Sequence, residues 1–437
     1  MKTRLWVAAA VTACALTLGA TAIARTATPD AEPAATFTKD VAPIFYAKCA
    51  SCHRPNEMAP MPLLTYDDVR PYVSAIRTKV SQGLMPPWHA DAPRGTFLND
   101  RRLTDIERDT ILRWASTGAP KGESKHLPPL PKFPEGWTIG TPDAVIKMAK
   151  AYDVPADGTI PYQYFAAPTN FTEDKWVQSL EIRPGARKVV HHVLVFSREP
   201  GAVSRPAAYV TRNPGSSPSP ASPSSTQPSA SSQPAANGIA SRGVLIATTA
   251  PGTNAQTFEP GTAMLIKAGS VLTFQIHYTA NGEPASDVTS IGMVFAKQPP
   301  AQEIRSGAFV NARFVIPPGA NNEKVESAIE FVEDSTIWAL FPHTHLHGKS
   351  WEYRLVTPDG QSTIVLAVPK YDFNWQTYYA FAQPLKVPKG ARLEATAHYD
   401  NSTANRSNPD PTAQVRWGDQ TWQEMQYSGI TYTVDKK

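Results

Sequence analysis

The stretch STIWALFPHTHLHG, residues 335–348, starts with strand-like alternation and ends with histidines at positions 343, 345 and 347. Because side chains alternate between the two faces of a strand, His343 and His345 can face one metal ion together. Imidazole ligands without a thiolate suit copper or zinc. Two interpretations stay open: a site that includes His347 as a third ligand, and a site whose third ligand comes from elsewhere.

Period-two alternation is found throughout the C-terminal two thirds of the chain. Gly, Pro and Asn/Asp turns separate the segments, as is typical of β-sandwiches. The further segments are WVQSLEIR (176–183), KVVHHVLVFS (188–197), SVLTFQIHYTA (270–280), SIGMVFA (290–296), SWEYRLVTP (350–358), STIVLAVP (362–369) and ARLEATAHYD (391–400). We therefore predict two β-sandwich domains, over 138–299 and 300–437, with IPPGA (316–320) at the start of the second.

Residues 37–124 have helical patterning instead. FTKDVAPIFYAKCASCH (37–53) predicts a helix capped by Thr38 with Val41, Ile44 and Phe45 on one face, and YDDVRPYVSAIRTKV (66–80) is similar. LTDIERDTILRWASTGAP (103–120) has a Thr104–Glu107 capping box, an apolar set of Ile106, Ile111, Leu112 and Trp114, and Gly118 as its stop. We predict a small all-α domain, followed by a proline-rich linker at 125–137.

CASCH (49–53) predicts one covalently attached haem c. Cys49 and Cys52 add to the haem vinyl groups, and His53 binds the iron. We expect Met85, in the stiff turn QGLMPPWHA, as the second axial ligand; Met58, Met61 and His89 are the alternatives. A thioredoxin-like redox pair would need a βαβ pattern, which the surrounding sequence lacks. The domain is therefore expected to be a c-type cytochrome.

The N-terminus predicts export. Lys2 and Arg4 precede an apolar stretch, and a small-x-small site favours cleavage after Ala24, so 1–24 reads as a signal peptide and 25–36 as a tether. VTAC (11–14) also fits a lipoprotein signal at Cys14, which stays open as an alternative. We expect a periplasmic or secreted protein without a transmembrane helix in the mature chain.

Composition excludes several classes of function. The formal net charge is only +4 and no basic stripe is present, so nucleic acid is not an expected partner. Export disposes of Cys14, and the two remaining cysteines lie in CASCH, so no disulfide framework is expected. The Ser/Pro/Ala segment 213–238 cannot bury a core and is predicted to be a disordered insertion. No GxSxG, Walker loop or HExxH motif is present.

Four segments resemble the copper type II, ascorbate-dependent monooxygenases: HHVLVF (191–196), FQIHY (274–278), PHTHLHG (342–348) and QEMQY (423–427). The resemblance covers roughly residues 138–437. It implies two sandwiches that each hold one copper ion, facing each other across a solvent-filled cleft. It assigns His191, His192 and His277 to the electron-transfer copper, and His343, His345 and Met425 to the copper where dioxygen is activated. YDFNWQ (371–376) and the segment from YDNST to QEM further resemble bacterial members fused to a cytochrome c domain.

The chain also departs from the family. It lacks the cysteine pairs that cross-link the animal enzymes. Phe341 stands where the peptide-amidating members have a carboxylate-binding arginine, and Tyr427 and Gly429 replace their asparagine and tyrosine. A peptide carboxylate is therefore not the expected substrate. His347 becomes dispensable in this comparison, and His398 is interpreted as structural.

The resulting hypothesis is a monooxygenase that hydroxylates a C–H bond of a small organic substrate with dioxygen. Its two copper ions would receive electrons through the haem, and an ascorbate-like reductant or a redox protein would be the donor. The alternative is a non-enzymatic periplasmic protein that binds copper or transfers electrons. HTHLHG is also similar to segments of laccases, but a multicopper oxidase needs a blue-copper cysteine, and none follows Cys52.

Overall fold

The computed structural model describes residues 34–55, 57, 59–134, 136–201, 207–212, 243–250 and 255–435. The predicted signal peptide with Cys14, most of the predicted tether, Met58 and the predicted insertion at 213–238 lie outside the described residues. Within the described part of the chain, no helix has both the length and the apolar character needed to cross a bilayer.

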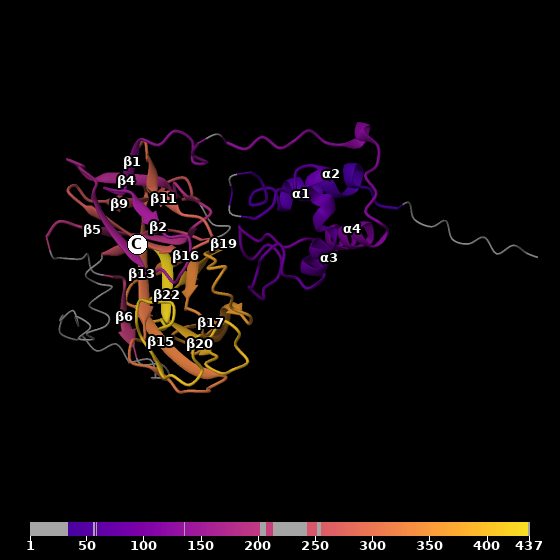
Figure 1. The fold of residues 1–437 in the computed structure, drawn as a ribbon. Helices are drawn as coiled ribbons and strands as arrows, with labels where there is room; N and C mark the ends of the chain where they lie inside the picture. The colour runs from indigo at the N-terminus through magenta and orange to yellow at the C-terminus, as the bar shows by residue number, and fades with distance from the viewer. Residues whose placement is uncertain are drawn as a thin grey trace, which may run out of the picture. The chain divides into compact units, whose positions relative to one another are not determined.

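The helices gather near the start of the described chain (Figure 1). They are η1 (Phe37–Val41), α1 (Ala42–Lys48), α2 (Tyr66–Val69), η2 (Arg70–Tyr72), α3 (Val73–Ser81), α4 (Asp105–Ser116) and η3 (Ser124–His126). They enclose a small core that includes Phe37, Phe45, Ile111 and Trp114. This packing gives the segment an apolar interior of its own.

Two details of the predicted helices are confirmed and two are wrong. Thr104 and Glu107 form the capping box of α4, and Gly118 follows that helix with a φ of 88°. The first helix does not start at a capping Thr38, which is buried inside it. It starts at Phe37 and is preceded by Thr36, whose amide donates to Asp40 Oδ2 at 2.7 Å. Ile106 is 80% exposed and does not belong to the apolar set, because it lies on the outer side of α4.

All eight predicted strand segments contain a strand, and the described residues form one large sheet with smaller sheets beside it. The large sheet runs in the order β1 (Ala144–Lys147), β12 (Ser290–Phe295), β4 (Lys175–Arg183), β9 (Thr262–Ile266), β13 (Gln302–Val310), β22 (Tyr427–Val434), β16 (Ser335–His343) and β19 (Tyr379–Val387), with β8 (Ala255–Thr257) beside β4. The sheet continues across the predicted boundary near residue 300, because β13 pairs with β9 at one end and with β22 at the other.

A second sheet covers the first half of the large sheet. It contains β3 (Gln163–Pro168), β10 (Val271–Tyr278), β5 (Val190–Arg198) and β7 (Val244–Thr249). Val193 and Phe274 from this sheet share one core with Val177 and Ile291 from the large sheet. A short pair, β2 (Tyr152–Val154) and β11 (Ala285–Asp287), adds to this half. Two sheets packed on one core make this half a β-sandwich.

A third sheet covers the other half in the same way. It contains β18 (Ser362–Val368), β17 (Gly348–Val356), β20 (Arg392–Tyr399), β15 (Glu323–Phe331) and β6 (Tyr209–Arg212). Tyr353 and Leu393 from this sheet share a core with Phe309 and Leu340 from the large sheet. A short pair, β14 (Val315–Ile316) and β21 (Val415–Arg416), includes part of IPPGA.

The segment between α3 and α4 contributes to this second core. Trp88 and Phe97 are 8% and 3% exposed, and Phe97 forms a β-bridge with Phe381 on β19. The Leu98 amide donates to the Ala380 carbonyl at 2.8 Å. Residues 88–99 therefore connect the helical part to the second sandwich by both side-chain packing and backbone hydrogen bonds.

Candidate metal centre

A β-bulge brings His191 and His192 to the same place. On a regular strand, adjacent side chains point to opposite faces, so these two could not meet one ion. In the pairing of β10 with β5, His277 lies opposite His192 but Tyr278 lies opposite Val190, which leaves His191 as the extra residue. A bulge of this kind re-aims a side chain. The three candidate nitrogens of His191, His192 and His277, called here the first histidine set, lie within 4.8 Å of one another.

Unsatisfied ring nitrogens indicate that this set fits a metal. The Nδ1 atoms of His191 and His192 are 3.0 Å apart, close enough to share a hydrogen bond. His191 Nε2, His192 Nε2 and His277 Nδ1 are buried without a hydrogen-bond partner among the described residues. Buried polar atoms normally have partners, so such an accumulation points to a missing ligand.

The second ligand set, His343, His345 and Met425, forms where β16 ends and β22 begins. The two strands are antiparallel, and His343 pairs with Tyr427, two residues beyond Met425. The rings of His343 and His345 lie 5.2 Å apart between centroids. Met425 is 5% exposed and packs with Phe341 and Tyr427 in a small apolar cluster. Strand pairing therefore brings together residues that lie far apart in the sequence.

Hydrogen bonds fix which nitrogen each histidine of the second set can offer. His343 donates from Nδ1 to Gln376 Oε1 at 2.8 Å, and His345 donates from Nδ1 to the Gln423 carbonyl at 3.1 Å. Both rings therefore retain Nε2 as the ligand atom, the usual arrangement when an outer partner orients a metal-binding imidazole. His345 Nε2 is buried without a hydrogen-bond partner in the described chain, which suits a metal-binding nitrogen.

Burial keeps these histidines neutral. It lowers the pKa of His191 and His345 to about 4, and the pKa of His277 and His343 to about 3. The pKa of His192 lies well below its usual value, first through burial and then through the four neighbouring histidines. Metal binding requires the neutral imidazole, so these rings need not lose a proton near neutral pH.

The two sets touch, which differs from the solvent-filled cleft that the resemblance implies. The rings of His192 and His343 lie 6.3 Å apart between centroids. Gln376 joins them, because its Oε1 accepts from His343 and its Nε2 lies 3.3 Å from His192 Nδ1. Phe373 lies against His191, with ring centroids 5.3 Å apart and an interplanar angle of 24°, and Tyr162 lies 5.0 Å from His277. Protein side chains fill the space between the sets.

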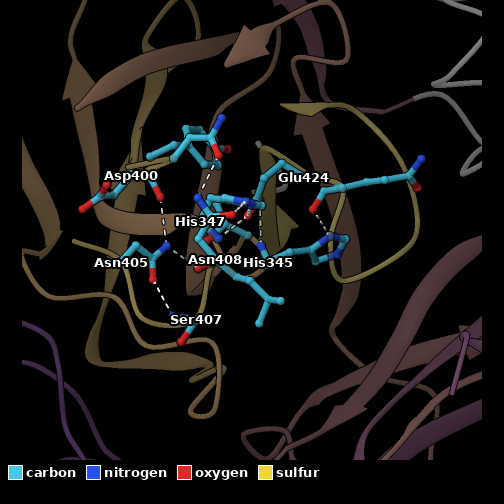
Figure 2. Close-up of polar contacts among 12 residues, drawn as sticks. His345, His347, Asp400, Asn405, Ser407, Asn408 and Glu424 are labelled. Atoms are coloured by element: carbon cyan, nitrogen blue, oxygen red, sulfur yellow. Dashed lines mark hydrogen bonds and ion pairs between the residues drawn. The ribbon is translucent and has the colours of Figure 1, made fainter. Parts of the chain in front are cut away.

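The third histidine of HTHLHG has other partners. His347 Nδ1 lies 3.3 Å from Glu424 Oε1, and its Nε2 lies 3.2 Å from Asn408 Oδ1 (Figure 2). Both ring nitrogens are thus occupied, which favours the interpretation that His347 is not a ligand. His398, on β20, has its Nδ1 3.2 Å from Ser350 Oγ.

The CASCH segment lies at the end of α1. Cys49 and Cys52 are free thiols, and burial raises the pKa of Cys49 to about 12. His53 Nδ1 lies 3.1 Å from the Met61 carbonyl, which leaves Nε2 as its remaining ring nitrogen. Met85 is half-buried. Its role as an axial ligand stays a prediction, as does the role of His53.

Four important residues were not recognised as site residues from the sequence: Gln376, Glu424, Phe373 and Tyr162. Gln376 and Phe373 belong to YDFNWQ, and Glu424 precedes the candidate methionine in QEMQY. Their position within these two family-like segments is the signal in the sequence that could have identified Gln376, Phe373 and Glu424 as site residues. Tyr162 had none, because it meets the histidines only through the fold.

A family comparison bears directly on the segment that contains the second ligand set. Residues 303–432 match the C-terminal domain of the copper type II ascorbate-dependent monooxygenases. The matched range contains His343, His345 and Met425. Together with the first histidine set, the match supports copper as the metal and an oxidoreductase of the monooxygenase type. For residues outside the range, the resemblance stays a prediction.

The other comparisons add nothing to this. No curated protein matches the chain. Among solved structures, the major capsid protein P2 from bacteriophage PM2 is similar with 10% identity and a TM-score of 0.27, over 67% of this chain and 98% of that one. A structure of the infectious bursal disease virus Gt strain reaches 10% identity and a TM-score of 0.19, over 66% and 70%. Such low scores support no conclusion about fold or function.

Proposed function

We propose that this protein is a copper-dependent monooxygenase that hydroxylates a C–H bond of a small organic substrate. The reaction consumes the substrate, one dioxygen molecule, two electrons and two protons, and it yields the hydroxylated product and water. The observation that supports it most is the meeting of two metal-ligand sets, one of them inside the part of the chain that matches the monooxygenase family.

The residues present fit copper at both sets. When bound, copper supplies the one-electron redox chemistry that oxygen insertion into a C–H bond requires. His191, His192 and His277 would hold one ion, and His343, His345 and Met425 the other. The thioether of Met425 is a soft ligand that favours the cuprous state. Desolvation by the surrounding protein holds the imidazoles neutral.

The surroundings of the second set favour an apolar substrate group. Phe341 stacks on His343, with ring centroids 6.0 Å apart and an interplanar angle of 19°. Phe341, Met425 and Tyr427 form one apolar cluster. Phe341 stands where the peptide-amidating members of the family have a carboxylate-binding arginine. Because it carries no charge, it offers no partner to an anionic substrate. We therefore expect the reacting C–H bond to lie in an uncharged part of the substrate.

We further propose that a haem at Cys49, Cys52 and His53, with Met85 as the second axial ligand, supplies the electrons. An ion pair of 2.9 Å joins Glu57, four residues after His53, to Arg187, four residues before His191. The N-terminal sequence supports export to the periplasm or beyond, where such a haem is attached.

The test uses the exported full-length protein. Copper and haem are quantified, and oxygen uptake is then measured with a reductant and a panel of small substrates. We expect two copper ions and one haem per chain, with oxygen uptake matched by hydroxylated product. In Met425→Ala we expect both the oxygen uptake and the product to be lost. Copper binding without any product would instead favour a protein that only binds copper or transfers electrons.

A separate measurement tests the electron supply. The protein is prepared with its haem reduced and its copper sites oxidised, and rapid-reaction spectroscopy follows both. The haem should be reoxidised at the rate at which copper is reduced. If turnover continues while the haem retains its electron, the haem is not the donor. That result would leave the monooxygenase proposal intact.

A further inference from the structure

A buried carboxylate lies between the two segments that provide the second ligand set. Glu424 is 0% exposed. Its Oε2 accepts from the amide of His345 at 2.7 Å and from the amide of Met425 at 3.1 Å. Its Oε1 accepts from the amide of His347 at 2.7 Å. One side chain therefore bonds the main chain of a candidate ligand in each segment.

His347 supports this carboxylate from the other side. Its Nδ1 lies 3.3 Å from Glu424 Oε1, an ion pair when the imidazole is protonated. Its Nε2 faces Asn408 Oδ1 at 3.2 Å, and the Asn408 amide group donates in turn to Asn401 Oδ1 at 2.9 Å. Figure 2 shows His347 between Glu424 and Asn408, with His345 beside it. A carboxylate removed from water needs such donors, because an unpaired buried charge is strongly unfavourable.

The loop around these residues is held at further points. The Asp400 amide donates to the His347 carbonyl at 2.8 Å, and Asn405 Nδ2 donates to the Leu346 carbonyl at 3.0 Å. Tyr371 Oη donates to the Thr344 carbonyl at 3.0 Å. These bonds fix where the loop lies, whereas Glu424, together with the bond from His345 Nδ1 to the Gln423 carbonyl, joins it to the segment of Met425. Glu424 Oε2 is the one atom among these contacts that accepts from the amides of both His345 and Met425, so it bears directly on the distance between the two ligands.

We propose that Glu424 is a positioning residue, which with His347 as its support holds His345 and Met425 at the spacing that one copper ion requires. The proposal rests on the proposed function for the identity of the metal. It gives the third histidine of HTHLHG a role other than metal binding. Loss of an outer partner of this kind typically lowers metal affinity about 10–100-fold.

The first experiment needs no metal. Hydrogen–deuterium exchange is measured on the metal-free full-length protein for wild type, Glu424→Gln and Glu352→Gln. The glutamine has the shape of glutamate, but its NH₂ group faces amide donors. We expect faster exchange at the amides of His345, His347 and Met425 in Glu424→Gln alone. Glu352 lies in the same half and pairs with Arg354 near the surface, so its variant controls for the loss of a carboxylate.

The second experiment follows the metal in the same proteins. Cuprous affinity is measured by chelator competition, and X-ray absorption reports sulfur bound to copper. In Glu424→Gln we expect the second set to bind copper about 10–100-fold more weakly with the sulfur signal reduced, while the first histidine set is unchanged. His347→Gln should weaken binding less, because the residue 347 amide can still donate to Glu424.

The outcomes separate this inference from the proposed function. Wild-type exchange and a wild-type sulfur signal in Glu424→Gln would overturn the positioning role, whatever the activity. Copper loss in His347→Gln as complete as in His345→Ala would make His347 a ligand and overturn it as well. A wild-type protein with no sulfur bound to copper would remove Met425 from the ligand set, and the inference with it. Failure to hydroxylate any substrate, with these signals as expected, would contradict only the monooxygenase.

Discussion

The first histidine set and the second ligand set are built in different ways. His192 and His277 lie opposite each other on paired strands, and a bulge adds His191. His345 and Met425 lie outside regular strands and are held by the Gln423 carbonyl and by Glu424. The first set is thus positioned by a sheet ladder, whereas in the second set only His343 lies on a strand, and the other two ligands depend on individual hydrogen bonds. We expect the first to tolerate substitutions around it better than the second.

The largest effect is expected from His345→Ala. It removes a ligand atom, so the second set should lose copper by far more than the roughly 10–100-fold that loss of an outer partner causes, and hydroxylation should stop. Copper per chain and product formation measure the two effects. Retention of two copper ions with normal turnover would contradict the assignment of this residue.

His277→Ala tests whether the ladder-built set is independent. We expect copper to fall from two ions to one per chain, with the sulfur signal at the second set preserved and turnover largely lost. Because Gln376 lies between the sets, the alternative result is loss of both ions. That result would show that the two sets form one cooperative centre, which contradicts the distinction drawn above.

Acid should destabilise the metal-free protein. Folded histidines with a pKa of about 3 to 4 stay neutral, while the unfolded chain takes up protons below a pKa of about 6.5. The unfolded state then binds more protons, so the free energy of unfolding falls as pH drops from about 6.5 towards 3, by a few kcal/mol. Urea unfolding at several pH values measures this fall.

Variants show which set dominates that pH dependence. His277→Gln and His343→Gln each remove one buried imidazole, so each should flatten the fall in stability. A stability that rises towards acid pH, or that falls as steeply in both variants as in the wild type, would contradict neutral burial of these rings.

The smallest effect is expected from Gln376→Leu. The leucine cannot accept the Nδ1 hydrogen of His343, so the second set should bind copper about tenfold more weakly. The first set should change little, because the contact of Gln376 with His192 is longer, at 3.3 Å, than its 2.8 Å bond with His343. Chelator competition measures both affinities, with Gln361→Leu in the β17–β18 turn as the control. Equal weakening of both sets would mean that Gln376 holds them jointly.

The sequence predicted the strands well because alternation records which face of a sheet is buried. SVLTFQIHYTA and KVVHHVLVFS became the paired strands β10 and β5. It failed where a contact is made outside a periodic pattern. Trp88 and Phe97 lie in a proline-rich loop, and nothing local shows that they pack against β19. Ile106 fits a helical pattern, yet the face it occupies meets no partner that would bury it.

The ligands were easier to predict than their supports. Histidine and methionine are conspicuous in a strand-rich sequence, so His191, His277 and Met425 could be singled out. The bulge at His191 depends on how two distant strands align, which no local pattern encodes. Gln376 and Glu424 are ordinary polar residues in the sequence. They become important only because folding removes them from water beside ring nitrogens and amides.

The uninterrupted large sheet has a mechanical consequence. Gln302 to Ile304 pair in parallel with Thr262 to Met264, and the same strand then pairs with β22. Any rotation of one sandwich against the other must bend this strand or break its ladder. On the proposed function, the distance between the two ligand sets therefore depends in part on β13, and we expect a proline introduced in that strand to make the rate of electron transfer between them vary from molecule to molecule.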